Sequence, residues 1–98
     1  MALETFPFDA SEYLDSEEDH VELLSAALST GNAASIATAL GIVARARGMT
    51  QIAKEAGVTR EALYKALSPD GDPKLTTLLG VLKALGVELS TVKRKKSA

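Results

Sequence analysis

The stretch MTQIAKEAGVTREALYKALS, residues 49–68, decides the fold, because it joins two short helical patterns across Gly57 and Val58. An isolated helix of about seven residues is only marginally stable in water. Neither pattern is therefore stable without a partner. We expect the rest of the chain to hold both helices in place.

The spacing of small and apolar residues within this stretch predicts how the two helices meet. Ala53 permits close approach of the second helix, and Gly57 can adopt the left-handed conformation of a tight turn. The angle between the helices is filled by apolar residues: Ile52, Val58 and Leu63. A helix-turn-helix, whose second helix can lie in the DNA major groove, has these requirements. An ordinary helical hairpin also satisfies them.

Capping signals upstream predict two further helices. Ser16 begins a Ser-x-x-Asp pattern that is similar to a capping box, and Gly31 is suited to end the helix that follows. Asn32 is suited to cap a second helix, which ends at Gly48 after two arginines. Thr59 is a good N-cap for the second half of the opening stretch.

Downstream, the turn SPDGDP at 68–73 precedes a leucine-rich helix. Gly71 permits a positive φ, and Asp72 with Pro73 reads as a cap followed by a first-turn proline. The helix begins near Lys74, ends at Gly86, and is expected to present one apolar face: Leu75, Leu78, Leu79, Leu82 and Leu85. This face serves either the core or a dimer contact.

The chain therefore reads as all-α, a compact bundle of about five helices with a central helix-turn-helix. Residues 1–15 form an N-terminal arm, 16–92 the folded domain with its motif at 49–68, and 93–98 a basic flexible tail. The segment VELSTV at 87–92 alternates like a short strand, but no other segment reads as its partner. It is a C-terminal strand only if it pairs with a second copy.

Composition limits the class of protein. The chain has 98 residues, enough for one domain, and contains no cysteine, which excludes disulfides, thiolate zinc sites and cysteine nucleophiles. No apolar run reaches the roughly 18 residues that cross a bilayer, and the acidic start is unlike a signal peptide. We expect a cytoplasmic protein without membrane contact.

The sequence offers no catalytic constellation. His20 is the only histidine, and no glycine-rich phosphate loop is present. One histidine cannot build a metal triad, and on an acidic helix we expect it to lie at the surface. We expect a protein that is not an enzyme and uses no cofactor or metal.

Charge is divided unequally along the chain. Residues 1–44 contain eight acidic residues and no Lys or Arg, whereas residues 45–98 contain all eleven basic residues and five acidic ones. The formal charge is therefore −8 followed by 11 − 5 = +6. Such asymmetry indicates either a charged partner such as nucleic acid or two merely solvated faces.

The segment RARGMTQIAKEAGVTREALYKALSPDGDPKLTTLLGVLKALGVEL resembles the probable addiction-module antidote proteins of bacteria, which belong to the Xre-like helix-turn-helix superfamily. The upstream FDASEYLDSEEDHVELLSAAL is similar to the N-terminal stretch of that family, so the resemblance covers about nine-tenths of the chain. It implies an antitoxin encoded beside a RelE-type toxin, which represses its own operon as a homodimer. Met49 stands where many Xre-like proteins place a phosphate-binding Gln.

The second helix of the motif carries the expected contacts to double-stranded operator DNA. Arg60, at its N-terminal end, is the strongest candidate for base readout because it can bond both acceptors of a guanine; the alternative is a solvated arginine or one paired with a nearby acid. Glu61 fits the helix start better than a base contact, and Tyr64 suits either a phosphate or packing. We expect Ala62, Leu63 and Ala66 to face inward. The predicted DNA-binding set is Thr50, Gln51, Thr59, Arg60, Glu61, Tyr64, Lys65 and Ser68.

Residues outside this set have weaker expected roles. Flanking phosphate contacts fix register without reading sequence, and the candidates are Arg45, Arg47, Lys54 and Lys74. Because RelE-type toxins are basic, the acidic half suits either a toxin contact or solvent. A stand-alone repressor, or a protein-interaction module that has lost DNA binding, fits the same residues.

Overall fold

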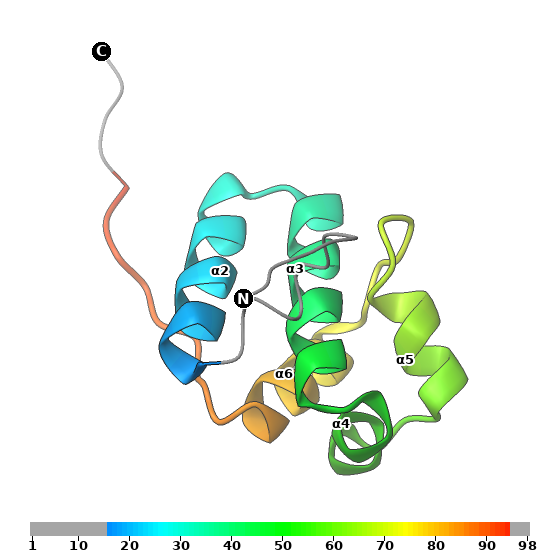
Figure 1. Ribbon diagram of the computed structural model, residues 1–98. Coiled ribbons are helices and arrows are strands. Elements are labelled where there is room, and N and C mark those ends of the chain that lie inside the picture. The colour runs from blue at the N-terminus through cyan, green and yellow to red at the C-terminus, as the bar shows by residue number, and fades with distance from the viewer. Residues whose placement is uncertain (1–15, 95–98) are drawn as a thin grey trace, which may run out of the picture.

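The computed structural model describes residues 16–94, which form five helices and no strand (Figure 1). The all-α prediction is confirmed over this range. The helices are α2 (Glu17–Thr30), α3 (Ala33–Arg47), α4 (Met49–Ala56), α5 (Arg60–Ala66) and α6 (Leu75–Ala84). The predicted arm at 1–15 and the last four residues of the predicted tail lie outside the described residues.

The upstream helices begin and end where their capping residues predict. The Ser16 hydroxyl accepts a hydrogen bond from the Asp19 amide at 3.1 Å, and Asn32 Oδ1 accepts one from the Ser35 amide at 2.8 Å. Gly31 ends α2 with a φ of 67°, a left-handed conformation that glycine adopts without steric cost. Each signal acts within four residues, so local sequence is sufficient to place it.

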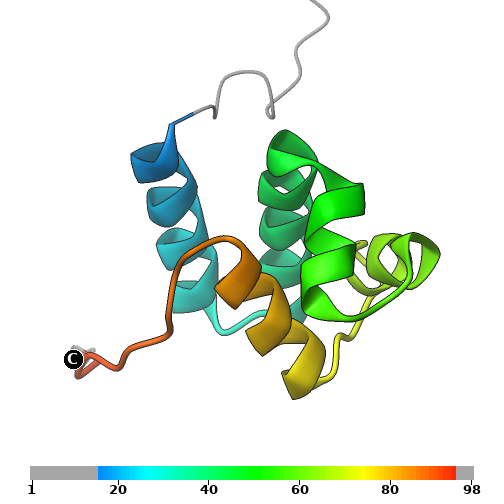
Figure 2. The ribbon, with the colours of Figure 1, turned by 90° about the horizontal axis from the view of Figure 1, so that it is seen from below.

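The helices pack as a pair, α2 with α3, joined through α3–α4 contacts to a group formed by α4, α5 and α6. α2 lies beside α3, and α4 contacts α3, α5 and α6 (Figures 1 and 2). The largest of the fully buried side chains belong to the core: Leu40, Val43, Leu63 and Val81. They come from α3, α5 and α6, so the core joins segments that are distant in sequence.

The buried face of α6 differs from the predicted leucine stripe. Val81, Leu82 and Leu85 are buried, whereas Leu75 and Leu79 are 65% and 47% exposed. The predicted cap is also wrong, because Lys74 is the N-cap residue and its side chain makes no capping hydrogen bond. Leu78 is partly buried against the core, so the apolar surface left uncovered on α6 is that of Leu75 and Leu79.

Gly71 is required for a reason other than the predicted one. Positive φ values among the described residues belong to Gly31, Gly48, Gly57 and Gly86, and Gly71 is absent from this group. A Cβ atom at position 71 would collide with the backbone carbonyl of Ala66 at the end of α5. The turn needs glycine because its backbone passes directly against that helix.

The prediction that His20 lies at the surface is wrong. His20 is 2% exposed, and its Nδ1 accepts a hydrogen bond from Arg47 Nε at 2.9 Å. Positions 20, 24 and 27 share one helical stripe, so His20 continues the buried face formed by Leu24 and Ala27. Arg47 also donates to the Leu85 carbonyl at 3.4 Å, which ties α2 and α3 to the end of α6.

Residues 87–94 follow α6 as an extended segment without a strand partner among the described residues. Gly86 has a φ of 78°, and the Val87 amide donates to the Leu82 carbonyl at 3.0 Å. This bond turns the chain out of the helix and packs Val87 against the core. In the single chain the predicted strand at 87–92 is therefore not formed.

Gly41→Ala is expected to destabilise the protein, although alanine is the better helix former. A Cβ atom on Gly41, in the middle of α3, would lie 2.6 Å from the Leu67 carbonyl oxygen. Overpacking of this kind costs about 1–3 kcal/mol, which exceeds the gain of about 0.5–1 kcal/mol from helix propensity. Urea unfolding measures whether the free energy of unfolding falls or rises in the variant. A more stable variant would contradict the close packing of α3 on the end of α5.

Candidate nucleic-acid interface

The α4–α5 unit is built by a tight turn at Gly57. Gly57 has a φ of 78°, and the Val58 amide donates back to the Ala53 carbonyl at 3.0 Å. α5 then begins at its N-cap Thr59, whose Oγ1 accepts from the Ala62 amide at 3.0 Å. Figure 1 shows α4 nearly end-on and α5 from the side, so their axes cross steeply.

Apolar residues hold this angle as their spacing predicts. Ile52 and Ala53 are each 3% exposed, Leu63 is fully buried, and Val58 packs on the same cluster. Met49, at the start of α4, is buried in the core. Its side chain therefore stabilises the fold and is almost entirely shielded from solvent.

The outer face of α5 exposes four of the predicted DNA-binding residues: Arg60, Glu61, Tyr64 and Lys65. Leu63 faces inward as predicted, and Ala66 is half-buried, but Ala62 is exposed. The prediction for Ala62 fails because α5 is held by a narrow stripe through Leu63 and Leu67. Almost the whole circumference of the helix is therefore accessible.

Arg60 and Tyr64 interact one turn apart on this face. Arg60 Nη2 lies 3.4 Å from the Tyr64 hydroxyl, and its guanidinium lies 5.4 Å from the centre of the ring. The hydrogen bond to Tyr64 raises the pKa of Arg60 above its ordinary value. The sequence prediction treated the two residues separately, although their i, i+4 spacing already places them together.

The remaining predicted residues flank α5. Gln51 on α4 donates to Glu55 Oε2 at 2.6 Å, and Thr50 is exposed beside it. The Ser68 hydroxyl donates to the Lys65 carbonyl at 2.9 Å, and that contact closes the end of α5. The Thr59 hydroxyl accepts its capping bond, so its own proton remains available for an acceptor.

The positive charge around α5 comes from fewer residues than predicted. Arg45, Lys54 and Lys74 are exposed. Arg47 is instead committed to the fold through His20 and Leu85, with a 3.9 Å contact to Glu17. It therefore cannot serve as the predicted phosphate contact without breaking the junction of α2, α3 and α6.

Residues 16–94 contain no cluster of three or more His, Cys, Asp or Glu side chains that could hold a metal ion. Over the same part of the chain, no helix is long and apolar enough to span a membrane.

Comparison with known proteins identifies the family. Residues 4–93 match the model of a family described as "Probable addiction module antidote protein". The chain is also 48% identical over 81 residues to an uncharacterized protein of Haemophilus influenzae, a match that covers 83% of this chain and 84% of that protein. No solved structure matches. The chain therefore belongs to the probable addiction module antidote protein family.

Proposed function

We propose that the protein is an antitoxin that represses its own operon as a dimer and neutralises a RelE-type toxin. Membership of an antidote family supports the antitoxin role and implies a toxin partner. The observation that carries DNA binding is the exposed outer face of α5, with its Arg60–Tyr64 pair and Lys65, beside the tight turn at Gly57. In this proposal the protein acts in the cytoplasm, by binding and without catalysis.

In the proposed complex, α4 and α5 work as a helix-turn-helix and α5 enters the major groove. Arg60 swings from the Tyr64 ring to bond the N7 and O6 acceptors of a guanine. Lys65, Tyr64 and the free hydroxyl proton of Thr59 contact phosphates, which fix the position of α5 without reading sequence. Glu61 stabilises the first turn of α5.

The start of α4 supplies a second phosphate contact. Its N-cap is Gly48, and no side chain caps its first turn. The exposed Thr50 and Gln51 flank the amides of this turn, which are oriented to bind an anion. A phosphate at this place needs no glutamine at position 49, which is consistent with the burial of Met49.

The DNA part is tested by binding to the duplex directly upstream of the gene, against a scrambled duplex of the same length, over a salt series. We expect tighter binding to the upstream duplex, two protomers per site, and an affinity that falls steeply with salt. Equal weak binding to both duplexes, or none, would contradict operator recognition and leave α4–α5 as a protein-binding element.

The toxin part rests on the surface of α2. This helix contains no Lys or Arg. Three of its acidic residues are exposed: Glu17, Glu18 and Glu22. Glu17 already contacts Arg47, whereas Glu18 and Glu22 make no ion pair among the described residues. The exposed carboxylates are suited to a basic partner.

The double variant Glu18→Lys/Glu22→Lys is expected to weaken binding to the product of the adjacent toxin gene while operator binding is retained. The matched control is Asp70→Lys/Asp72→Lys, which makes the same charge change at exposed residues of the turn before α6. Isothermal titration with the purified toxin measures the affinities. Equal losses in both double variants would mean that net charge, rather than the α2 surface, governs the interaction.

A further inference from the structure

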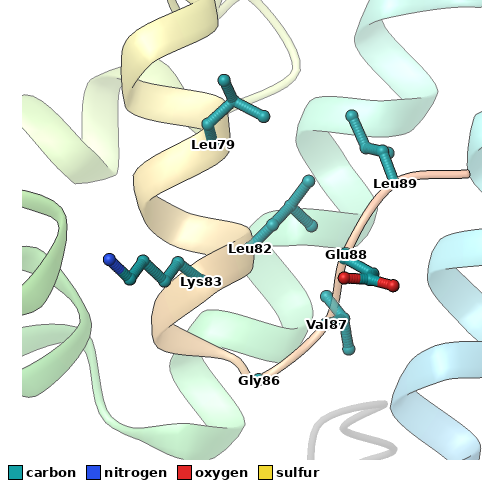
Figure 3. Close-up of a pocket in the computed structure, with 7 residues that line it drawn as sticks. All are labelled: Leu79, Leu82, Lys83, Gly86, Val87, Glu88 and Leu89. Carbon is teal, nitrogen blue, oxygen red and sulfur yellow. The ribbon is translucent and has the colours of Figure 1, made fainter.

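A groove lined by both apolar and charged residues lies between α6 and the extended segment that follows it (Figure 3). Its volume is about 630 Å³, and Leu79 and Leu82 of α6 face Leu89 of the segment across it. Lys83 and Glu88 lie at its borders. Leu79 and Leu89 are 47% and 43% exposed, so the groove presents apolar surface to solvent.

The extended segment itself has an unpaired backbone. Among the described residues, no hydrogen bond involves the amides or carbonyls of residues 88–94. Figures 1 and 2 both show this part of the chain passing α2 and then projecting away from the helices. Val92, near its end, is 91% exposed. An extended segment with apolar side chains and free backbone groups is a template for pairing with another chain.

We propose that residues 88–94 of two copies pair as antiparallel strands about a two-fold axis, with the groove of each copy beside the pair. This inference rests on the dimer of the proposed function, and it identifies the surface through which the two copies would bind each other. A two-stranded ribbon is marginal by itself. Burial of Leu79 and Leu89 supplies the apolar contact that the ribbon needs.

Symmetry limits the register of such a pair. In an antiparallel ladder, hydrogen-bonded and non-hydrogen-bonded residue pairs alternate. A two-fold axis between two identical strands passes midway between the two residues of one such pair, so that pair consists of the same residue from each copy. When Thr91 faces Thr91 of the second copy, Glu88 faces Arg94 of that copy. This is the symmetric register that matches Glu88 with a basic residue of the described segment. Opposite charges and paired threonines are both favourable across strands.

Charge also favours a second copy over the other partners of the proposed function. The groove is bordered by one cation and one anion, Lys83 and Glu88, so an identical surface related by a two-fold axis is complementary to it. A basic toxin would meet Lys93 and Arg94 at the end of the segment. A strand from the second copy instead places Arg94 opposite Glu88.

Cysteine cross-linking tests the register, because the native chain contains no cysteine. Under oxidising conditions Thr91→Cys is expected to give a disulfide-linked dimer, since facing residues in an antiparallel pair have Cα atoms about 4.5–5.5 Å apart. The control is Ser90→Cys, equally exposed, whose two copies would lie roughly 7–8 Å apart on the diagonal. Equal cross-linking at both positions would overturn the proposed pairing.

Sedimentation equilibrium without DNA tests the dimer itself. The amides of neighbouring residues in a strand point to opposite edges, so either the Ser90 or the Thr91 amide faces the partner strand. The double variant Ser90→Pro/Thr91→Pro therefore removes one inter-strand hydrogen-bond donor from each copy. We expect the dimer Kd to rise about tenfold or more. Ser90→Ala/Thr91→Ala keeps the amides and should retain the dimer. Circular dichroism should show unchanged helix content in both variants.

A native chain that is monomeric at all accessible concentrations, or a dimer that the proline variant leaves intact, would overturn the inference. Such a failure would remove the dimer from the proposed function, but it is separate from failure of operator recognition. Loss of the predicted dimer does not affect the comparison of specific with scrambled DNA. Conversely, a strand-paired dimer that ignores operator DNA would uphold the pairing and contradict the repressor role.

Discussion

Leu63→Ala is expected to destabilise the protein by about 2–5 kcal/mol, the range for removing a fully buried leucine from a core. Leu63 is 0% exposed and belongs to the same apolar cluster as Ile52 and Val81. It is the central attachment of α5, which has only seven residues and cannot persist without tertiary contacts. The truncation therefore removes core packing and the support of the candidate interface together.

Urea unfolding measures this loss as a lower midpoint with an unchanged m-value. The control is Leu75→Ala, which removes the same atoms from a side chain that is 65% exposed. We expect the control to change the free energy of unfolding by no more than about 0.5 kcal/mol. Similar losses in the two variants would contradict the position of Leu63 at the centre of the core.

Arg60→Ala is expected to weaken binding to the operator by about 1–3 kcal/mol, or roughly 5- to 140-fold in Kd. A guanidinium that bonds two acceptors of one guanine is lost, and alanine offers no replacement. Arg60 is fully exposed and its contacts are with Tyr64, so the substitution should leave the fold intact. Competition binding against operator and scrambled duplexes measures the effect.

Two further variants separate base reading from general attraction. Lys54→Ala removes an exposed positive charge from α4 and should weaken operator and scrambled DNA alike, lowering the salt slope by about one. Arg60→Lys keeps the charge at position 60 but loses the two-pronged geometry, so it should behave like Arg60→Ala on the operator. If Arg60→Ala reduces affinity for both duplexes equally, Arg60 does not read a base.

Sequence reasoning failed where the outcome depends on distant parts of the chain. His20 reads as a surface residue among acids, yet Arg47, 27 positions later, covers it. The leucine face of α6 reads as serving either the core or a dimer contact, and in the single chain Leu75 and Leu79 are left 65% and 47% exposed. Helical periodicity identifies an apolar stripe but cannot state how far along the helix a neighbour covers it.

The candidate site follows the same division. The exposure of Arg60, Glu61, Tyr64 and Lys65 could be predicted because the turn at Gly57 sets which positions of α5 face outward. The pairing of Arg60 with Tyr64 is a local consequence of their spacing. The commitment of Arg47 to His20 and Leu85 could not be foreseen, since it requires α2, α3 and α6 to be assembled.

The sequence by itself determined the starts of α2, α3 and α5 and the α4–α5 turn, because caps at Ser16, Asn32 and Thr59 and the left-handed turn at Gly57 satisfy backbone groups only a few residues away. The tertiary structure alone decided which apolar residues are covered. Burial depends on which helices meet, so only the assembled chain shows Val81 enclosed and Leu79 facing an open groove beside an extended segment.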